Sequence, residues 1–320
     1  MMGWTMTSST QLAHGEAPAS RPAKKRGNRA PAFLLTPAGI VIIALVVIPL
    51  GFMIFTSFTD FSQRTLFTGE FDFVGLKQYQ SVLTDPAFYA ALLRTFGFTA
   101  ALVAGSVLAG MGVAQLMTKL GGVMRYLVIF VLIFAWAMPN VASSVVWKWL
   151  FQPGYGVINW LLTQLHVFGD MTNTSWIDNT WLAFLEIWLL VVWQAVPYIA
   201  ITLYAATTQV DQSCIEAAQL DGCSKLRCYW QIVVPLISPS IMVITMLSII
   251  WDFNVFNQIW LISQGGPQDT TATIGIFTYK KAFVSFEIGT GSAASVLVTI
   301  VLLALTSVYI RYLLKSGEDL

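Results

Sequence analysis

The chain has 320 residues, of which 56% are hydrophobic and 10% are charged, and its mean hydropathy is +0.70. Soluble globular domains carry about 25% charged residues, so the composition excludes an ordinary soluble protein and indicates a polytopic membrane protein. The formal net charge of +1 identifies no class of partner. Only the distribution of charge along the chain is informative.

Residues 1–32 are rich in Ala, Pro, Ser and basic types, which predicts a disordered basic tail. Six later segments have the ~20 mostly apolar residues that a membrane-spanning helix needs. They are residues 33–58, 94–117, 126–151, 181–204, 241–262 and 292–314. The first lacks a small-residue cleavage site and exceeds the length of a signal-peptide core, so we expect a retained span. The predicted fold class is an all-α integral membrane protein with a six-helix domain over residues 33–314 and a short end at 315–320.

Lys and Arg placement predicts the orientation of the spans. Eleven of the 17 basic residues fall on one side of the membrane. They are Arg21, Lys24, Lys25, Arg26, Arg29, Lys119, Arg125, Lys225, Arg227, Arg311 and Lys315. The loop at 152–180 contains none. We therefore expect both termini and the polar segment at 208–239 to be cytoplasmic.

Polar and aromatic groups inside the spans are the candidates for a translocation path, because such groups in lipid normally face a cavity or another helix. The polar candidates are Asn140, Ser143, Ser144, Glu186, Gln194, Asp252, Asn254, Asn257 and Gln258, and the aromatic ones are Trp136, Trp188, Trp193, Trp251 and Phe253. The alternative is that the amides join helices to one another. The two carboxylates need specific partners, and Lys148 is one that either could pair with. Other tryptophans near the outer boundary fit an aromatic belt.

The prolines and cysteines give weaker indications of fold and function than the polar groups do. Pro49, Pro139 and Pro197 lie within spans, where a missing amide donor permits a kink. The three cysteines, Cys214, Cys223 and Cys228, are irregularly spaced, so we expect free thiols in a reducing compartment and no metal site.

The segment from 211 to 239 carries helix start and stop signals. Ser213 with Glu216 three residues later is a capping-box pattern, and Gly222 supplies a left-handed stop. Ser224 can cap a second short helix, and Pro235 marks a break before the fifth span. Spacing alone also allows an amphipathic loop lying on the bilayer.

Glu216, Ala217 and Ala218, then three residues and Gly222, then nine residues, Ile232, two residues and Pro235 form a 20-residue pattern. This pattern resembles the signature of binding-protein-dependent ABC importer permeases. The resemblance implies a coupling helix that docks in a cleft of a cytoplasmic ATPase. It assigns ATPase coupling to Glu216, Ala217, Ala218, Asp221, Gly222 and Pro235.

Weaker likenesses point to the carbohydrate subfamily related to the maltose system. Val74–Tyr79 with Asp85-Pro86, Trp147–Phe151, Gly156–Asn159, Gln264–Pro267 and Gly289–Ala293 resemble segments of those permeases. Together with the signature they cover most of the chain from residue 33 onward. The family often has Asn-Thr where this chain has Arg94-Thr95, so local contacts there are expected to differ.

The chain has no G-x-x-x-x-G-K-[ST] phosphate loop, so we expect a transport subunit that is not an enzyme, with ATP and Mg bound by a partner ATPase and no cofactor on this chain. The expected partners are a second homologous permease, two cytoplasmic ATP-binding subunits, an extracytoplasmic solute-binding protein and membrane lipid, with no nucleic acid. The expected location is the cell membrane of a bacterium, with sugar or oligosaccharide as cargo. Alternatives are another cargo such as glycerol phosphate, a secondary transporter or channel, or a membrane-embedded enzyme, for which no catalytic constellation is visible.

Overall fold

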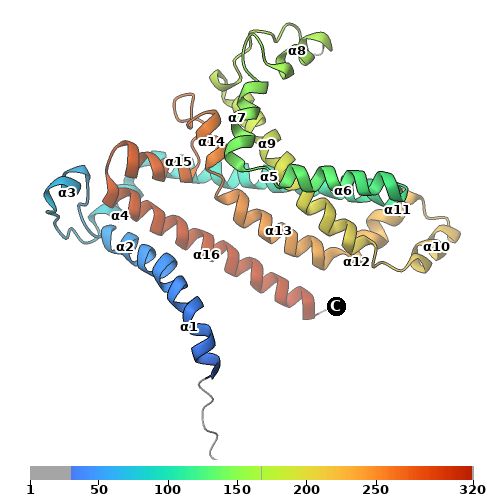
Figure 1. The fold of residues 1–320 in the computed structure, drawn as a ribbon, viewed down its shortest axis with the longest axis horizontal. Coiled ribbons are helices and arrows are strands. Elements are labelled where there is room, and N and C mark those ends of the chain that lie inside the picture. The colour runs from blue at the N-terminus through green and yellow to red at the C-terminus, as the bar shows by residue number, and fades with distance from the viewer. Residues whose placement is uncertain (1–29, 167, 319–320) are drawn as a thin grey trace, which may run out of the picture. The chain divides into compact units, whose positions relative to one another are not determined.

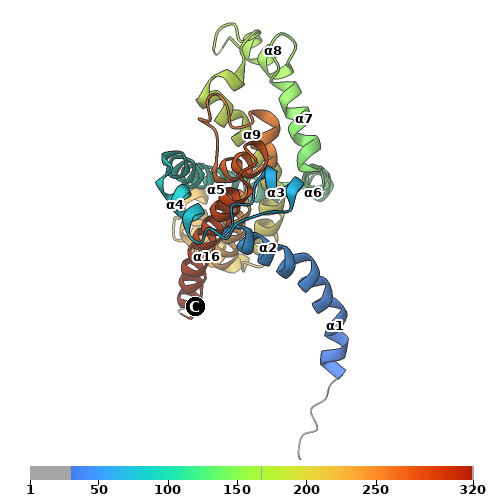
Figure 2. The same ribbon diagram turned by 90° about the vertical axis from the view of Figure 1, so that its left-hand side faces the viewer.

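The computed structural model describes residues 30–166 and 168–318, and these residues are mostly helical (Figures 1 and 2). Within them no strand forms, and the only bridge is an isolated one between Thr59 and Phe73. Of the predicted basic tail at 1–32, residues 1–29 lie outside the described part of the chain. The chain divides into two compact units, residues 1–49 and 50–320.

The first unit contains α1 (Ala30–Ile42), a π-helical turn η1 (Ile43–Val47) and the start of α2 (Ile48–Thr56). The helices of the second unit are, in order, α3 (Gln63–Thr68), α4 (Lys77–Thr84), α5 (Pro86–Lys119), α6 (Gly122–Trp136), α7 (Asn140–Leu150), α8 (Val157–Gln164), η2 (Trp176–Asp178), α9 (Thr180–Thr207), α10 (Gln212–Leu220), α11 (Lys225–Cys228), η3 (Tyr229–Val233), α12 (Val234–Leu236), α13 (Ser238–Phe253), α14 (Asn257–Ile262), α15 (Ile274–Tyr279), η4 (Lys280–Val284) and α16 (Ile288–Glu318).

Five helical segments in the described part of the chain are long and apolar enough to cross a membrane, and a sixth is present if one bent pair is counted as a single span. The five are Leu35–Thr56, Pro86–Lys119, Thr180–Thr207, Ser238–Ile262 and Ile288–Arg311. The predicted all-α membrane fold is therefore confirmed. The last helix continues through residue 318, beyond the predicted boundary at 314.

The third predicted span, residues 126–151, is two helices rather than one. α6 and α7 meet at an angle of 98° across residues 137–139 (Figure 1). Pro139 causes the break, because it lacks an amide hydrogen and disfavours helical geometry at the residue before it. Pro197, by contrast, lies inside the continuous helix α9.

Helices α5 and α9 pack closely along much of their lengths. Gly110 permits this approach, since a Cβ atom at that position would collide with the side chain of Ile199. Around the contact, Met111, Ala114 and Leu203 form a buried apolar cluster with residues that follow α10. This packing places the C-terminal ends of α5 and α9 beside α10 and α11.

Helices α13 and α16 also pack together in the second unit (Figure 1). The hydroxyl of Tyr309 donates a hydrogen bond to the carbonyl of Met242 over 2.7 Å. Because Met242 lies near the start of α13, the C-terminal part of α16 is at the same end of the bundle as α10 and α11. Large apolar side chains on α6, such as Phe130 and Phe134, are exposed, as expected of a surface that faces lipid.

Candidate functional site

A cavity of about 570 Å³ lies where α6, α7, α9 and α13 meet. Two interruptions in the helices create it: the break before α7 and the non-helical turn at 254–256 between α13 and α14. Its lining residues include Asn140, Gln194, Asp252, Asn254 and Asn257, all of which had been predicted for a translocation path. No Lys or Arg lines it.

A chain of three side-chain amides crosses one wall of this cavity. Gln194 on α9 donates to Asn140 Oδ1 over 3.2 Å, and its own Oε1 accepts a hydrogen bond from Gln258 over 3.2 Å. The three residues come from α7, α9 and α14. Each amide retains donor or acceptor capacity beyond these two bonds, so the wall can offer hydrogen bonds to a polar molecule.

Four aromatic side chains line the same cavity beside the amides: Trp136, Tyr198, Trp251 and Phe256. Trp136 stacks on Tyr198 with centroids 6.2 Å apart, and Tyr198 meets Trp251 edge-on at 5.5 Å. Tyr198 was not predicted from the sequence, although it lies four residues after Gln194 and helical spacing places such residues on one face. Polar amides next to aromatic faces are the groups that hold an uncharged polar ligand.

Asp252 contributes the one carboxylate of the cavity. Its side chain is buried, with 7% exposure, and Oδ2 has no hydrogen-bond partner within the described structure. Ser248, one helical turn earlier, lines the cavity too. A buried acceptor without a partner is costly, so this oxygen is a candidate contact for a donor group on a passing ligand.

Other predicted path residues lie elsewhere. Ser144 is buried, and its hydroxyl donates to the carbonyl of Asn140 in its own helix over 2.7 Å. Ser143 is also buried, and its hydroxyl donates to the carbonyl of Pro139 over 3.1 Å. Trp193 packs on Trp147 within an apolar cluster, and buried Glu186 does not line the cavity. These residues are internal packing groups, because helix rotation turns them away from the cavity.

The second candidate element is the exposed turn formed by α10 and α11. The cap lies two residues earlier than predicted: Asp211, not Ser213, is the N-cap, and its carboxylate accepts a hydrogen bond from the Ser213 amide over 2.9 Å. This bond lowers the pKa of Asp211 from its ordinary value of 3.8. Asp is as good a cap as Ser, so the pattern predicted the helix but misplaced its first residue.

Gly222 ends α10 as predicted, in the left-handed conformation at φ +84°. The Cys223 amide donates back to the carbonyl of Ala218 over 3.0 Å, which closes the helix end in the manner of a Schellman motif. Ser224 then caps α11, again as predicted. The chain then passes through the π-helical turn η3, where the Val234 amide donates to the carbonyl of Tyr229. The short helix α12 ends at Leu236, so a break follows Pro235 before α13, as predicted.

The surface of this turn is apolar as well as charged. Glu216 and Ala217 are exposed, Leu220 is 90% exposed and Leu226 is 71% exposed. Isolated apolar residues on a surface are common, but two largely exposed leucines flanking one glycine turn suit a protein contact. The fold and these two elements define the class: a multi-pass membrane protein with a polar intramembrane cavity and a separate exposed helical turn.

Comparison with known proteins gives the family. Residues 101–316 match the family described as binding-protein-dependent transport system inner membrane component. The chain belongs to this family, and it is a permease subunit of an ABC importer. It is 35% identical over 94% of its length to the diacetylchitobiose uptake system permease protein DasB of Streptomyces coelicolor, covering 91% of that protein.

More distant relatives include the trehalose/maltose transport system permease protein MalF of Thermococcus litoralis, 27% identical over 87% of this chain and 91% of that one. The fold also resembles a crystallised bacterial ABC transporter involved in import of the acidic polysaccharide alginate, with a TM-score of 0.74 at 16% identity over 89% of this chain and 95% of that one. At that identity the likeness supports the fold alone.

Proposed function

We propose that this chain forms half of the membrane path of an ATP-driven importer for an uncharged sugar or short oligosaccharide. The observation that carries the proposal is the Asn140, Gln194 and Gln258 amide chain lying beside stacked aromatic rings in one cavity. Sugar hydroxyls pair with amides, and the C–H faces of a pyranose pack on aromatic rings. The cargo of the two relatives supports the same class of substrate: diacetylchitobiose for DasB, and trehalose or maltose for MalF.

A neutral cargo is favoured over an anionic one such as glycerol phosphate. A phosphate or sulfonate in a low-dielectric cavity needs cationic partners, whereas Asp252 is the only charged residue in the lining. Lys148 does not line the cavity, and its Nζ donates a hydrogen bond to the carbonyl of Leu261 over 3.4 Å. One relative, SmoG of Agrobacterium fabrum, is a sulfoquinovosyl glycerol transport system permease and 29% identical, but this cavity lacks a cation for such a group.

The exposed turn at α10 and α11 is the proposed docking site for a cytoplasmic ATPase, with Glu216, Ala217, Ala218, Asp221, Gly222 and Pro235 in or beside it. Its exposure and its well-defined helix end support this role. On this proposal both termini are cytoplasmic, ATP and Mg are bound by two ATP-binding partner subunits, a second permease completes the path, and a solute-binding protein delivers the cargo.

Uptake into proteoliposomes containing the assembled transporter tests the proposal. With its binding protein outside and ATP inside, labelled diacetylchitobiose and maltose would be compared with glycerol 3-phosphate. We expect ATP-dependent uptake of a neutral sugar. Uptake driven by an ion gradient without ATP hydrolysis, or faster uptake of the phosphate ester, would overturn the assignment.

A further inference from the structure

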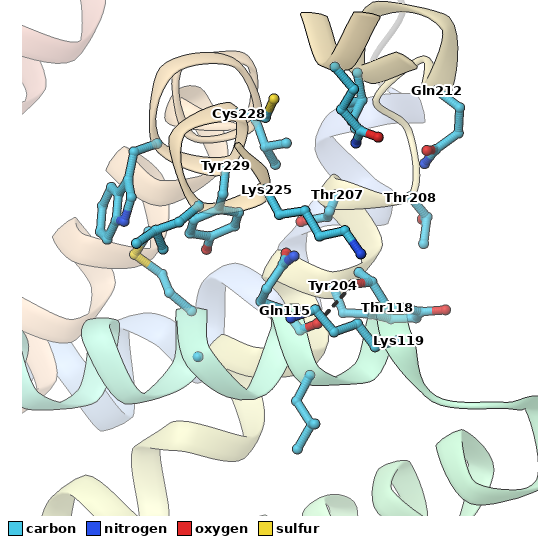
Figure 3. Close-up of a pocket in the computed structure, with 18 of the residues that line it drawn as sticks. Gln115, Thr118, Lys119, Tyr204, Thr207, Thr208, Gln212, Lys225, Cys228 and Tyr229 are labelled. Carbon is cyan, nitrogen blue, oxygen red and sulfur yellow. Dashed lines mark hydrogen bonds between the residues drawn. The ribbon is translucent and has the colours of Figure 1, made fainter. Parts of the chain in front are cut away.

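A second, larger cavity lies at the end of the bundle that carries α10 and α11. Its volume is about 970 Å³, and its walls come from the last turns of α5, the start of α6, the end of α9 and the α10 to η3 segment (Figure 3). It shares no lining residue with the cavity that contains the amide chain. The groove is therefore separate from the cargo path, although α10 and α11 of the docking turn form one of its walls.

Three cations and no carboxylate line the groove: Lys119, Arg125 and Lys225. None of the three forms an ion pair within the described part of the chain. Lys119 and Lys225 are exposed, and Figure 3 shows the Lys225 side chain extending toward Thr207 and Thr208. Like charges gathered without a counter-charge attract an anion from outside.

Arg125 is held in place rather than free to swing away. Its Nε and Nη2 donate to the carbonyls of Met117 and Leu120 over 3.1 and 2.7 Å, at the C-terminal end of α5. Its guanidinium also lies 5.5 Å from the ring centroid of Tyr204 on α9. The groove thus has a fixed positive wall, with two exposed lysines beside it.

The rest of the groove is apolar and runs along a membrane span. Leu108, Gly112 and Leu116 follow one another at four-residue spacing on α5 and all line it. The helix rises about 16 Å between Lys119 and Leu108, which is roughly half of a ~30 Å hydrocarbon core. Nothing lies within 4 Å of the position that a Cβ atom on Gly112 would occupy, so the stripe has open space above it.

We propose that this groove binds one anionic phospholipid, with its phosphate at Lys119, Arg125 and Lys225 and an acyl chain along the Leu108 to Leu116 stripe. Basic pockets between membrane helices bind lipid headgroups in this way. A free phosphate would use only the charged end and leave the apolar stripe uncovered. A soluble partner that reaches α10 from the aqueous side cannot follow the stripe into the hydrocarbon layer.

Native mass spectrometry of the assembled transporter, loaded from mixed vesicles, measures the preference. We expect at least tenfold greater retention of phosphatidylglycerol than of phosphatidylcholine. Lys119→Gln combined with Lys225→Gln is expected to weaken phosphatidylglycerol binding about thirtyfold, from roughly 1 kcal/mol for each lysine near the surface. Gly112→Leu fills the stripe without changing charge, and we expect about a tenfold loss.

Lys315→Gln is the matched control, because Lys315 is exposed in the last turns of α16 at the same end of the bundle but does not line the groove. We expect it to change retention less than twofold. Equal retention of both lipids, an equal loss with Lys315→Gln, or normal retention by Gly112→Leu would each overturn the proposal. Displacement of the lipid by millimolar inorganic phosphate would instead indicate a site for a free anion. A groove filled by residues of a partner subunit, with no lipid retained, would indicate a protein contact.

Discussion

Gln194 on α9 donates a hydrogen bond to Asn140 on α7 over 3.2 Å, although the two residues lie 54 positions apart. The contact exists because α7 begins afresh at Asn140 after the 98° break. Gln258 joins from α14 by donating to Gln194. Gln194 is thus the centre of the amide chain, and it is the residue through which the cavity wall is most easily perturbed.

Replacing Gln194 by Ala removes both hydrogen bonds of this chain. We expect sugar uptake to fall about tenfold, since a net loss of about 1.4 kcal/mol from these two hydrogen bonds, one exposed and one partly buried, corresponds to that factor. The amount of subunit inserted in the membrane should not change. Ser144→Ala is the matched control, because its hydroxyl bonds only within its own helix. Equal losses in both variants would show that the amide chain has no specific role in transport.

Replacing Gly222 by Ala strains the end of α10. The left-handed conformation at φ +84° costs an L-residue about 1 to 2 kcal/mol, whereas space is no obstacle because a Cβ atom would meet nothing within 4 Å. We expect more ATP hydrolysed per sugar imported, and a larger effect from Gly222→Pro. Gly154 has the same φ of +84° in a loop remote in sequence from α10. Gly154→Ala should therefore leave the ratio of ATP hydrolysed to sugar imported unaltered. Normal coupling in Gly222→Pro would refute the docking role.

The cap at Asp211 predicts a pH dependence. The hydrogen bond from Ser213 lowers the pKa of this carboxyl below 3.8, so the stabilisation is present above pH 3.8 and is lost as the pH falls through the lower folded-state value. We expect amide protection factors in α10 to be constant from pH 8 to pH 5. Asp211→Ala should lower them throughout that range, and Asp211→Asn should retain them because Asn also caps helices. Protection that declines between pH 7 and pH 5 would contradict this account.

Asn159 organises the loop between α7 and α9. Its Oδ1 accepts from Trp176 Nε1 over 2.7 Å, and its Nδ2 donates to the carbonyl of Thr174 over 3.0 Å. Asn159→Ala leaves the buried indole N–H unpaired, which costs about 1 to 3 kcal/mol. We expect faster proteolysis within 152–180 and a shift in tryptophan fluorescence. The exposed Asn173 provides the control, and an Asn173→Ala variant that loosens the loop as much would exclude a special role for Asn159.

Several features could be predicted from local sequence because they depend on nearest neighbours along the chain. Long apolar runs predicted the spans, and the glycine at 222 predicted the helix end. The capping signal was correct for the helix and wrong for its first residue, because Asp211 and Ser213 are both good N-cap residues and the sequence does not show which of them has the extended backbone.

The path residues show where local reasoning stops. Polarity selected Ser144 and Gln194, and aromatic character selected Trp193, yet of these three only Gln194 lines the cavity. Which side chain faces it depends on helix rotation and on where neighbouring helices begin and end, and both are determined by packing of the whole bundle.

By itself, the sequence determined that this protein crosses the membrane repeatedly and bears a glycine-ended helical turn between two spans, because hydropathy and backbone preference act over a few residues. Tertiary structure alone decided that Asn140, Gln194 and Gln258 meet beside four aromatic side chains. It also decided that Lys119, Arg125 and Lys225 surround one groove. Those groupings require helix ends far apart in the chain to converge, and convergence is set by burial and close packing between helices rather than by any local preference.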